Sequence, residues 1–329
     1  MIGYIRLSLA IAVLLSHVGV TVNGLNPGVI SVVIFYMLAG GVVAHIYNDV
    51  LPEGRDKLFR FYKDRCLRIF PLYFYTVFLT LTFLLISSYG TPSYSLSALL
   101  HNALIIPLNY YMVIESTILT QPSWNLIPPA WSLGTELQAY ILLPFALKYR
   151  RFRITIVMVS LLIYMAANLS YIHTDYFGYR LLPGVLFIFI LGASLREYNK
   201  NKSYWFSIGS FVIASITYMG IMYQQVLPQA YAQETLIGLI IGIPLLTVAN
   251  DINIKIPYNK QVGILSYGIF LTHFLAIWFI DYCELMIPSG LTYYLAVFAL
   301  AVLISKPGIS LIERRVSKAR MQATKQVTS

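Results

Sequence analysis

The chain alternates between long apolar segments and short polar loops, and most of the apolar segments approach the length needed to cross a bilayer. An α-helix needs about 20 consecutive apolar residues to span the hydrocarbon core. The pattern therefore predicts an all-α fold, a polytopic membrane helix bundle with about ten transmembrane helices. The expected spans cover residues 4–22, 28–47, 70–88, 131–147, 154–170, 180–196, 205–224, 234–250, 263–282 and 291–310.

The basic residues orient these spans, because they gather in alternate loops. With the N-terminus in the cytoplasm, every one of the 23 Lys and Arg residues except Arg180 faces inward. Cytoplasmic loops carry such an excess of Lys and Arg, so both termini are expected in the cytoplasm. We expect a membrane domain over residues 1–312 and a basic cytoplasmic tail over 313–329, of a kind that binds anionic lipid.

Segment 99–115 is apolar but does not fit this alternation. It contains His101, Asn102, Pro107 and Asn109. Counting it as a span would turn every later basic loop outward, against the positive-inside rule. We expect a re-entrant or interfacial piece on the outer side, with a full span as the alternative.

Composition and charge narrow the class of protein further. The chain is 58% hydrophobic and 11% charged, whereas soluble domains carry roughly 25% charged residues. This excludes a soluble domain of comparable size. The formal net charge of +10 is accounted for by the cytoplasmic loops, so we expect the bilayer as a partner and no nucleic acid.

The first apolar segment contains two ionisable residues, Arg6 and His17. Such side chains are costly in a membrane and usually mark a functional site. Eleven residues at ~100° each complete about three helical turns, so both lie on one face, ~16 Å apart along the axis. This places a cation near the cytoplasmic surface and an imidazole deep on the same stripe. A structural histidine bonded to a neighbouring helix is the alternative for His17.

Four further polar residues lie at depths compatible with His17. Glu136 follows the outer start of its span by about five residues, and Ser132 precedes it by one turn on the same face. Tyr36 and His273 lie eight and ten residues into their spans. A histidine pair, a carboxylate and hydroxyl groups in apolar surroundings suit proton transfer to or from a hydroxyl. A packing hydrogen bond between helices is the alternative for Glu136.

A second candidate site lies at the cytoplasmic side, in DRCLRIFPLY. Arg65 and Arg68 are three residues apart and would share a helix face, and arginine forks bind phosphate bidentately. With Arg6 entering from the same side, they suggest a phosphate-binding mouth. The alternative is that both arginines serve topology alone.

Five blocks of this sequence resemble, in order, motifs of the membrane acyltransferase 3 family. They are Arg6 to His17 as an Arg-x10-His pair, IFYMLAGGVVAH with Ala39 where serine is common, RCLRIFPLY as Arg-x-x-Arg-x-x-Pro, WSLGTE from Trp131 as Trp-Ser-Leu-x-x-Glu, and ILSYGIFLTH as the late Ser-Tyr and His block. These matches and the residues that follow them extend from residue 6 to Glu313. Each block is weak alone, and five in register are specific.

The resemblance implies an acyltransferase that moves an acyl group from cytoplasmic acyl-CoA to a glycan or lipid-linked sugar. We expect acetyl-CoA as co-substrate, with no metal and no permanently bound cofactor. His17 would be the general base or an acyl carrier, and Glu136 would orient the imidazole or the acceptor. The phosphates of acyl-CoA would bind Arg6, Arg65 and Arg68, and the acceptor side would be supported by Tyr36, Trp131, Ser132 and His273.

The expected location is a bacterial cytoplasmic membrane, where a homo-oligomer is compatible with the sequence. The chain ends soon after the last expected span, so we expect no fused extracytoplasmic hydrolase-like domain. A transporter or flippase for a lipid-linked glycan is the rival function, because buried charges and re-entrant segments also mark substrate paths. A non-catalytic scaffold is a third possibility.

Overall fold

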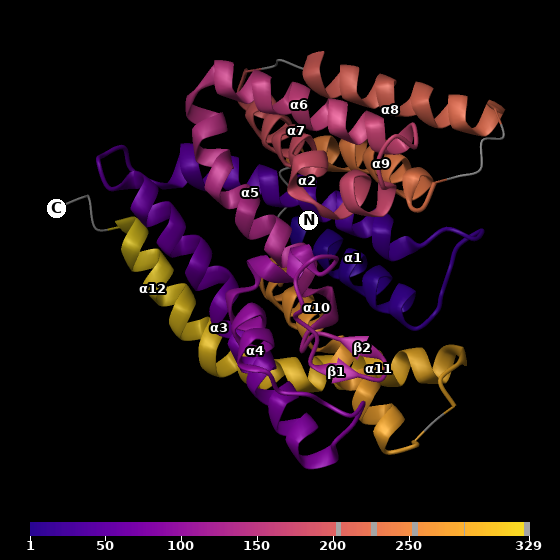
Figure 1. Ribbon diagram of the computed structural model, residues 1–329. Coiled ribbons are helices and arrows are strands. Elements are labelled where there is room, and N and C mark those ends of the chain that lie inside the picture. Colours follow the sequence, from indigo (N-terminus) through magenta and orange to yellow (C-terminus); the bar gives the residue numbers. More distant parts are fainter. Residues whose placement is uncertain (202–204, 225–228, 252–255, 286, 326–329) are drawn as a thin grey trace. The chain divides into compact units, whose positions relative to one another are not determined.

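The computed structural model describes residues 1–201, 205–224, 229–251, 256–285 and 287–325, and these are mostly helical (Figure 1). The α-helices are α1 (Ile2–His17), α2 (Pro27–His45), α3 (Lys57–Ser87), α4 (Leu96–Leu104), α5 (Trp131–Lys148), α6 (Arg150–Asn168), α7 (Leu182–Asn201), α8 (Trp205–Gln224), α9 (Ala232–Asp251), α10 (Asn259–Tyr282), α11 (Gly290–Gly308) and α12 (Arg314–Lys325). The other elements are short 3₁₀ or π segments, η1 (Ile46–Val50), η2 (Ile106–Tyr110), η3 (Pro128–Ala130), η4 (Thr174–Arg180) and η5 (Ile309–Glu313), and a hairpin of β1 (Leu119–Thr120) and β2 (Ser123–Trp124).

Seven helices among the described residues are long and apolar enough to cross a membrane, which confirms the expected all-α membrane bundle. They run over Pro27–Val50, Lys57–Ser87, Arg150–Asn168, Thr174–Glu197, Ala232–Asp251, Asn259–Tyr282 and Gly290–Ile312. The remaining three expected spans correspond to α1, α5 and α8. The count of ten, the cytoplasmic termini and the domain boundary after residue 312 stay predictions. Lys202 and Lys255, two of the basic residues used for orientation, lie outside the described residues.

The expected re-entrant segment 99–115 does not form one continuous helix. It contains the end of α4, then η2 and a turn. Helix α4 has nine residues, which at 1.5 Å per residue is about 14 Å and half of a hydrocarbon core. The break comes at Ile105, whose φ of 65° no α-helix accommodates. The segment is therefore too interrupted to cross as a single α-helix.

The chain forms two compact units, and α3 and α5 each contribute residues to both. The first unit contains residues 20–61 and 135–257, together with residue 1. The second contains residues 2–19, 62–134 and 258–329. Each unit is described by itself below.

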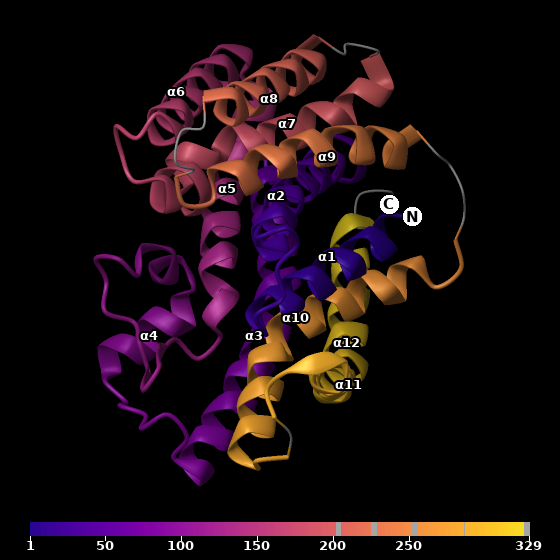
Figure 2. The ribbon, with the colours of Figure 1, turned by 90° about the vertical axis from the view of Figure 1, so that its right-hand side faces the viewer.

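In the first unit, α2 packs against α7 and α9, while α6 lies on α7 and α8 alongside α9 (Figure 2). Glycines allow the closest approach. A Cβ atom on Gly40 would lie 1.8 Å from the carbonyl oxygen of Phe189, and one on Gly192 would lie 1.9 Å from that of Met37. Small residues at such crossings let helix backbones touch, which is how helices associate in membranes.

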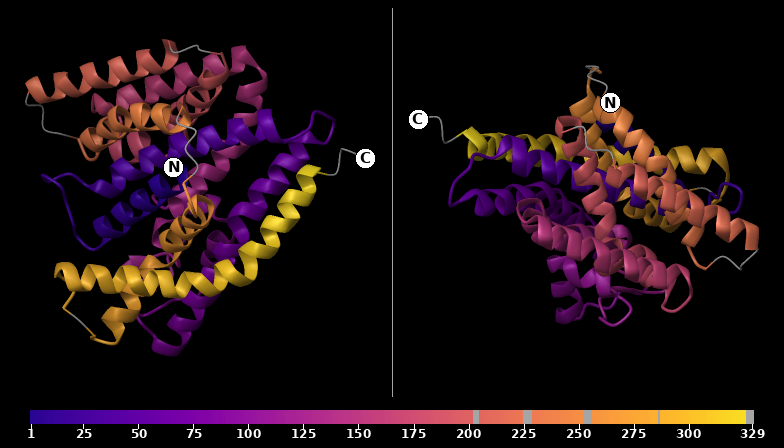
Figure 3. Two further views of the ribbon diagram at one scale, coloured as in Figure 1. Left: turned by 180° about the vertical axis from the view of Figure 1, so that it is seen from behind. Right: turned by 90° about the horizontal axis from the view of Figure 1, so that it is seen from above.

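In the second unit, α1 packs along α10, and α10 packs against α11. Helix α3 is tied to the same group, because Tyr267 Oη donates to the carbonyl of Ile69 and Tyr75 Oη to that of Ile304. The C-terminal helix α12 turns away from α11 and runs alongside α3 (Figure 3). These contacts join α1, α3, α10 and α11 into one packed group within the second unit.

Local sequence explains where the first two helices end and begin. Helix α1 ends at His17, five residues before the expected end of the span. The cause is Gly19, whose φ of 87° is the left-handed conformation that glycine adopts after a helix C-terminus. Asn26 then caps α2 by accepting hydrogen bonds from the backbone of Gly28 and Val29, with Pro27 as the first helical residue.

A fully buried asparagine organises the loop between α4 and α5. Asn102 Nδ2 donates to the carbonyls of Ala98 and Ser116, and its Oδ1 accepts from the backbone of Leu126. Tyr73 Oη, from α3, donates to the carbonyl of Asn102. Because each of these bonds is buried and would be costly to lose, they hold the β1–β2 hairpin and the approach to α5 in place.

Candidate functional site

The second unit brings two of the expected site residues together, His17 at the end of α1 and His273 in α10. Their rings are stacked, with centroids 5.3 Å apart and 23° between the planes. Phe274 contacts both, at 4.8 Å from His17 and 5.1 Å from His273. His17 is exposed and His273 is fully buried. The imidazole of His17 is therefore accessible, whereas that of His273 is not.

The buried histidine has a defined hydrogen-bonding state. Its Nδ1 lies 3.1 Å from the carbonyl oxygen of Ile269. A carbonyl can only accept, so Nδ1 carries the hydrogen and Nε2 of the neutral ring is an acceptor. Among the described residues, no hydrogen-bond partner contacts that buried Nε2. Buried polar atoms are usually satisfied, so His273 presents an acceptor nitrogen that a substrate hydroxyl could use.

A tryptophan that was not among the expected site residues packs against Phe274, next to the two histidines. Trp124, in β2, contacts Phe274 with ring centroids 5.5 Å apart and is 37% exposed. Trp278, one turn beyond Phe274 on α10, contacts it at 5.8 Å. The β1–β2 hairpin therefore adds a partly exposed aromatic ring next to Phe274, which contacts both histidines. Only the neighbouring position of Phe274 and His273 was visible in the sequence.

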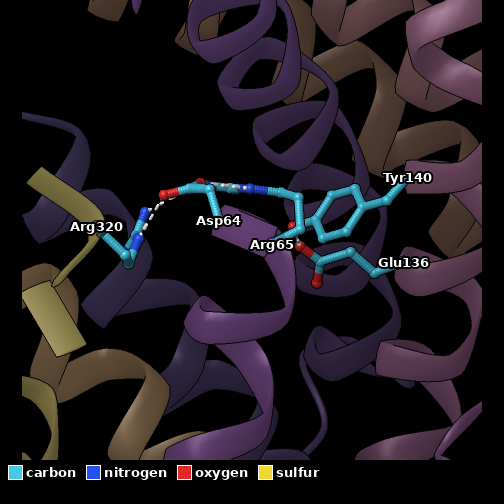
Figure 4. Close-up of polar contacts among 5 residues, drawn as sticks. All are labelled: Asp64, Arg65, Glu136, Tyr140 and Arg320. Atoms are coloured by element: carbon cyan, nitrogen blue, oxygen red, sulfur yellow. Dashed lines mark hydrogen bonds and ion pairs between the residues drawn. The ribbon is translucent and has the colours of Figure 1, made fainter. Parts of the chain in front are cut away.

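Glu136 and Tyr36 belong to the first unit. Glu136 is half-buried in α5 and accepts a hydrogen bond from Tyr140 Oη, one turn further along (Figure 4). Thr135 Oγ1 donates to the carbonyl of Arg180, and Arg180 is paired with Asp175 at 2.7 Å. Arg180, the one basic residue expected on the outer side, is thus neutralised locally.

The remaining residues expected on the acceptor side have structural contacts. Tyr36 is buried and its ring stacks on Phe189, with centroids 4.7 Å apart. Ser132 is buried, and its hydroxyl donates to the carbonyl of Pro129. Trp131 begins α5, as expected, and is half-buried. The roles of all three at an acceptor site stay predictions.

The two expected phosphate-binding arginines, both on α3, have different surroundings. Arg65 is buried and pairs with Asp64, which also pairs with Arg320 of α12 (Figure 4). Arg68 lies over the ring of Tyr267, 5.0 Å from its centroid. Arg6 is half-buried in α1, eleven residues before His17. Asp64 directly precedes Arg65 in the sequence, but nothing in the sequence linked it to Arg320.

Comparison with known proteins supports the motif matches over most of the chain. The model of an acyltransferase domain family matches residues 2–306. An uncharacterized protein of Aquifex aeolicus (strain VF5) is 39% identical over 222 residues, which is 65% of this chain and 100% of that protein. No solved structure matches the chain. Every expected site residue lies within the matched range, whereas Arg320 lies beyond it.

Proposed function

The chain belongs to the membrane acyltransferase 3 family and is an integral membrane acyltransferase, and from this premise we propose that it moves an acetyl group from cytoplasmic acetyl-CoA to a hydroxyl of a cell-surface polysaccharide or lipid-linked sugar. The proposed location is a bacterial cytoplasmic membrane, with both termini inside. The observation that carries the proposal is the stacked pair of His17 and His273. The buried Nε2 of His273, which contacts no hydrogen-bond partner among the described residues, suits a hydroxyl substrate.

In the proposed reaction, His17 acts as the general base. It takes the proton of the acceptor hydroxyl while the hydroxyl oxygen attacks the thioester carbonyl. The tetrahedral intermediate then collapses, the carbon–sulfur bond breaks, and the thiolate of coenzyme A takes the proton from His17. The products are an O-acetyl sugar and coenzyme A, and the histidine is regenerated. His273 is proposed to accept a hydrogen bond from the acceptor through Nε2.

The other residues are proposed to hold the two substrates. Arg65, Arg68 and Arg6 would bind the phosphates of acetyl-CoA, since arginine forks match phosphate oxygens. The pantetheine arm is an extended chain comparable in length to the ~16 Å between Arg6 and His17 along α1. It could therefore carry the thioester from the phosphate site to the imidazole. Glu136 is proposed as the carboxylate that orients the acceptor.

The direct test is transfer of label by the purified protein. Reconstituted protein incubated with labelled acetyl-CoA and a crude glycan fraction is expected to yield labelled glycan and free coenzyme A in equal amounts. Mass analysis of the labelled product would identify the sugar. Movement of glycan across the vesicle membrane without transfer of label would contradict the proposal and support a transporter. Label retained on the protein in the absence of glycan, and lost in His17→Ala, would make His17 an acyl carrier.

Trp124 is expected to contribute to acceptor binding, because its partly exposed ring is amphipathic, of the kind on which sugar rings stack. Trp124→Ala should raise the KM for the acceptor by roughly 2- to 12-fold, which corresponds to about 0.5–1.5 kcal/mol for one aromatic contact. The KM for acetyl-CoA should not change, and Trp124→Phe should retain most of the affinity.

Tyr171→Ala is the control, since Tyr171 is a more exposed aromatic residue that belongs to the first unit. It should leave both KM values unchanged. An unchanged acceptor KM in Trp124→Ala would show that Trp124 only packs on Phe274.

A further inference from the structure

One buried carboxylate in the second unit, Asp64 of α3, is shared by its neighbour Arg65 and by Arg320 of α12. Asp64 Oδ2 accepts from Nε of Arg65 at 3.0 Å and also from its Nη2. Asp64 Oδ1 accepts from Nε of Arg320 at 2.6 Å, and Nη2 of Arg320 lies 3.4 Å from Oδ2. Figure 4 shows the three side chains in one row, with Asp64 in the middle. Both oxygens of the carboxylate are thus engaged by guanidinium groups.

The three side chains differ in how far they are open to solvent. Asp64 keeps 8% of its side-chain surface and Arg65 keeps 4%, whereas Arg320 keeps 22%. Two guanidinium groups held together would repel each other, and the repulsion is strong where water is excluded. The single carboxylate between them removes most of that cost and leaves the group with a net charge of one positive unit.

The position of this group matches the proposed donor site. Arg68 follows Asp64 by one helical turn on α3, so its cation lies at the same end of that helix. Helix α12 runs alongside α3 (Figure 1) and contributes Arg320 to this end. Three arginines and one carboxylate therefore gather where a polyphosphate group is expected.

We propose that Arg320 is a third phosphate-binding arginine of the donor site, and that Asp64 is the positioning residue that holds Arg65 and Arg320 side by side. The proposed ligand is the nucleotide end of acyl-CoA, whose diphosphate and ribose phosphate can engage several planar forks at once. The C-terminal helix is then part of the donor site. This inference rests on the proposed function in taking acyl-CoA as the donor.

The experiment compares donors with and without the nucleotide phosphates. Arg320→Ala should raise the KM for acetyl-CoA roughly 10- to 150-fold, the range expected for one lost charged hydrogen-bonding group. Its kcat and its KM for acetyl-pantetheine, which lacks those phosphates, should stay at the wild-type values. Arg320→Lys should recover part of the affinity, since it keeps the charge and loses the fork.

Two variants of the same helix provide matched controls. Arg315 and Lys318 are exposed on α12. Arg315→Ala and Lys318→Ala remove the same charge from the tail and should leave the KM for acetyl-CoA unchanged. Asp64→Asn should raise that KM as well, because the amide holds the two guanidinium groups less firmly. Its folding is checked by thermal unfolding, and Arg320→Ala remains the decisive variant if Asp64→Asn does not fold.

Titration of the purified protein with coenzyme A separates this inference from the proposed reaction. If the wild type binds coenzyme A but transfers no acetyl group, the proposed reaction fails, and the inference is judged on whether Arg320→Ala weakens that binding by the same factor. Normal affinity for coenzyme A in Arg320→Ala would overturn the inference. An equal rise in KM for both donors would also overturn it, because it would show a purely structural role. Absence of coenzyme A binding in the wild type would overturn both.

Discussion

Replacing His17 by alanine is expected to lower the rate of acyl transfer roughly 10²- to 10⁴-fold, the usual contribution of a positioned general base. The protein should still fold and insert, because His17 is exposed and is the last residue of α1. Initial rates of label transfer at saturating acetyl-CoA measure the effect. Thermal unfolding of the variant in the same detergent shows whether the fold is retained.

The matched control for this prediction is His45→Ala. His45 ends α2, where its Nδ1 lies 3.0 Å from Asp49 Oδ2, and it has no proposed role in the reaction. It should transfer acetyl at close to the wild-type rate. A His17→Ala protein with wild-type turnover would remove His17 from the reaction, and with it the mechanism built on the histidine pair.

Glu136→Gln is expected to reduce kcat roughly 10²- to 10⁴-fold, as when a carboxylate that orients a reacting group is replaced by its amide. The glutamine has the same shape, and its carbonyl oxygen can still accept the hydrogen bond from Tyr140 Oη. The fold of the first unit should therefore be retained while the negative charge is lost. The measurement is kcat with acetyl-CoA and the glycan acceptor, both saturating.

Tyr140→Phe tests the hydrogen bond of Glu136 without changing the charge of its carboxylate. This change removes the hydrogen bond that Tyr140 Oη donates to Glu136 but keeps the carboxylate. Its effect on kcat should be about fivefold, corresponding to roughly 1 kcal/mol for one hydrogen bond. If Glu136→Gln turns over like the wild type while Tyr140→Phe unfolds at a lower temperature, Glu136 is a packing residue of α5.

Most helix ends followed from the sequence to within five residues, because each depends on residues close together in the chain, whereas α3 begins at Lys57, 13 residues before the expected span 70–88. The start of α5 at Trp131 agrees with the expected span, since a pair of prolines precedes an apolar run there. The end of α1 at His17 was missed by five residues, because apolar residues continue past Gly19 and hydropathy does not register the left-handed conformation of that glycine. The expectation that segment 99–115 is re-entrant or interfacial came from the charges of the later loops and stays a prediction, whereas the turn at Ile105 was not foreseen.

The sequence by itself determined that this is an all-α membrane protein of the acyltransferase 3 family, since bilayer thickness requires long apolar runs and the family motifs are short and local. It also singled out His17 and His273, but their stacking depends on how α1 packs along α10. The tertiary structure alone placed Trp124 on Phe274, and Arg320 on Asp64 across 256 residues of chain. No periodicity or spacing encodes such pairs, because they arise where separate helices and loops cross, and their geometry is set by the packing of side chains from distant segments.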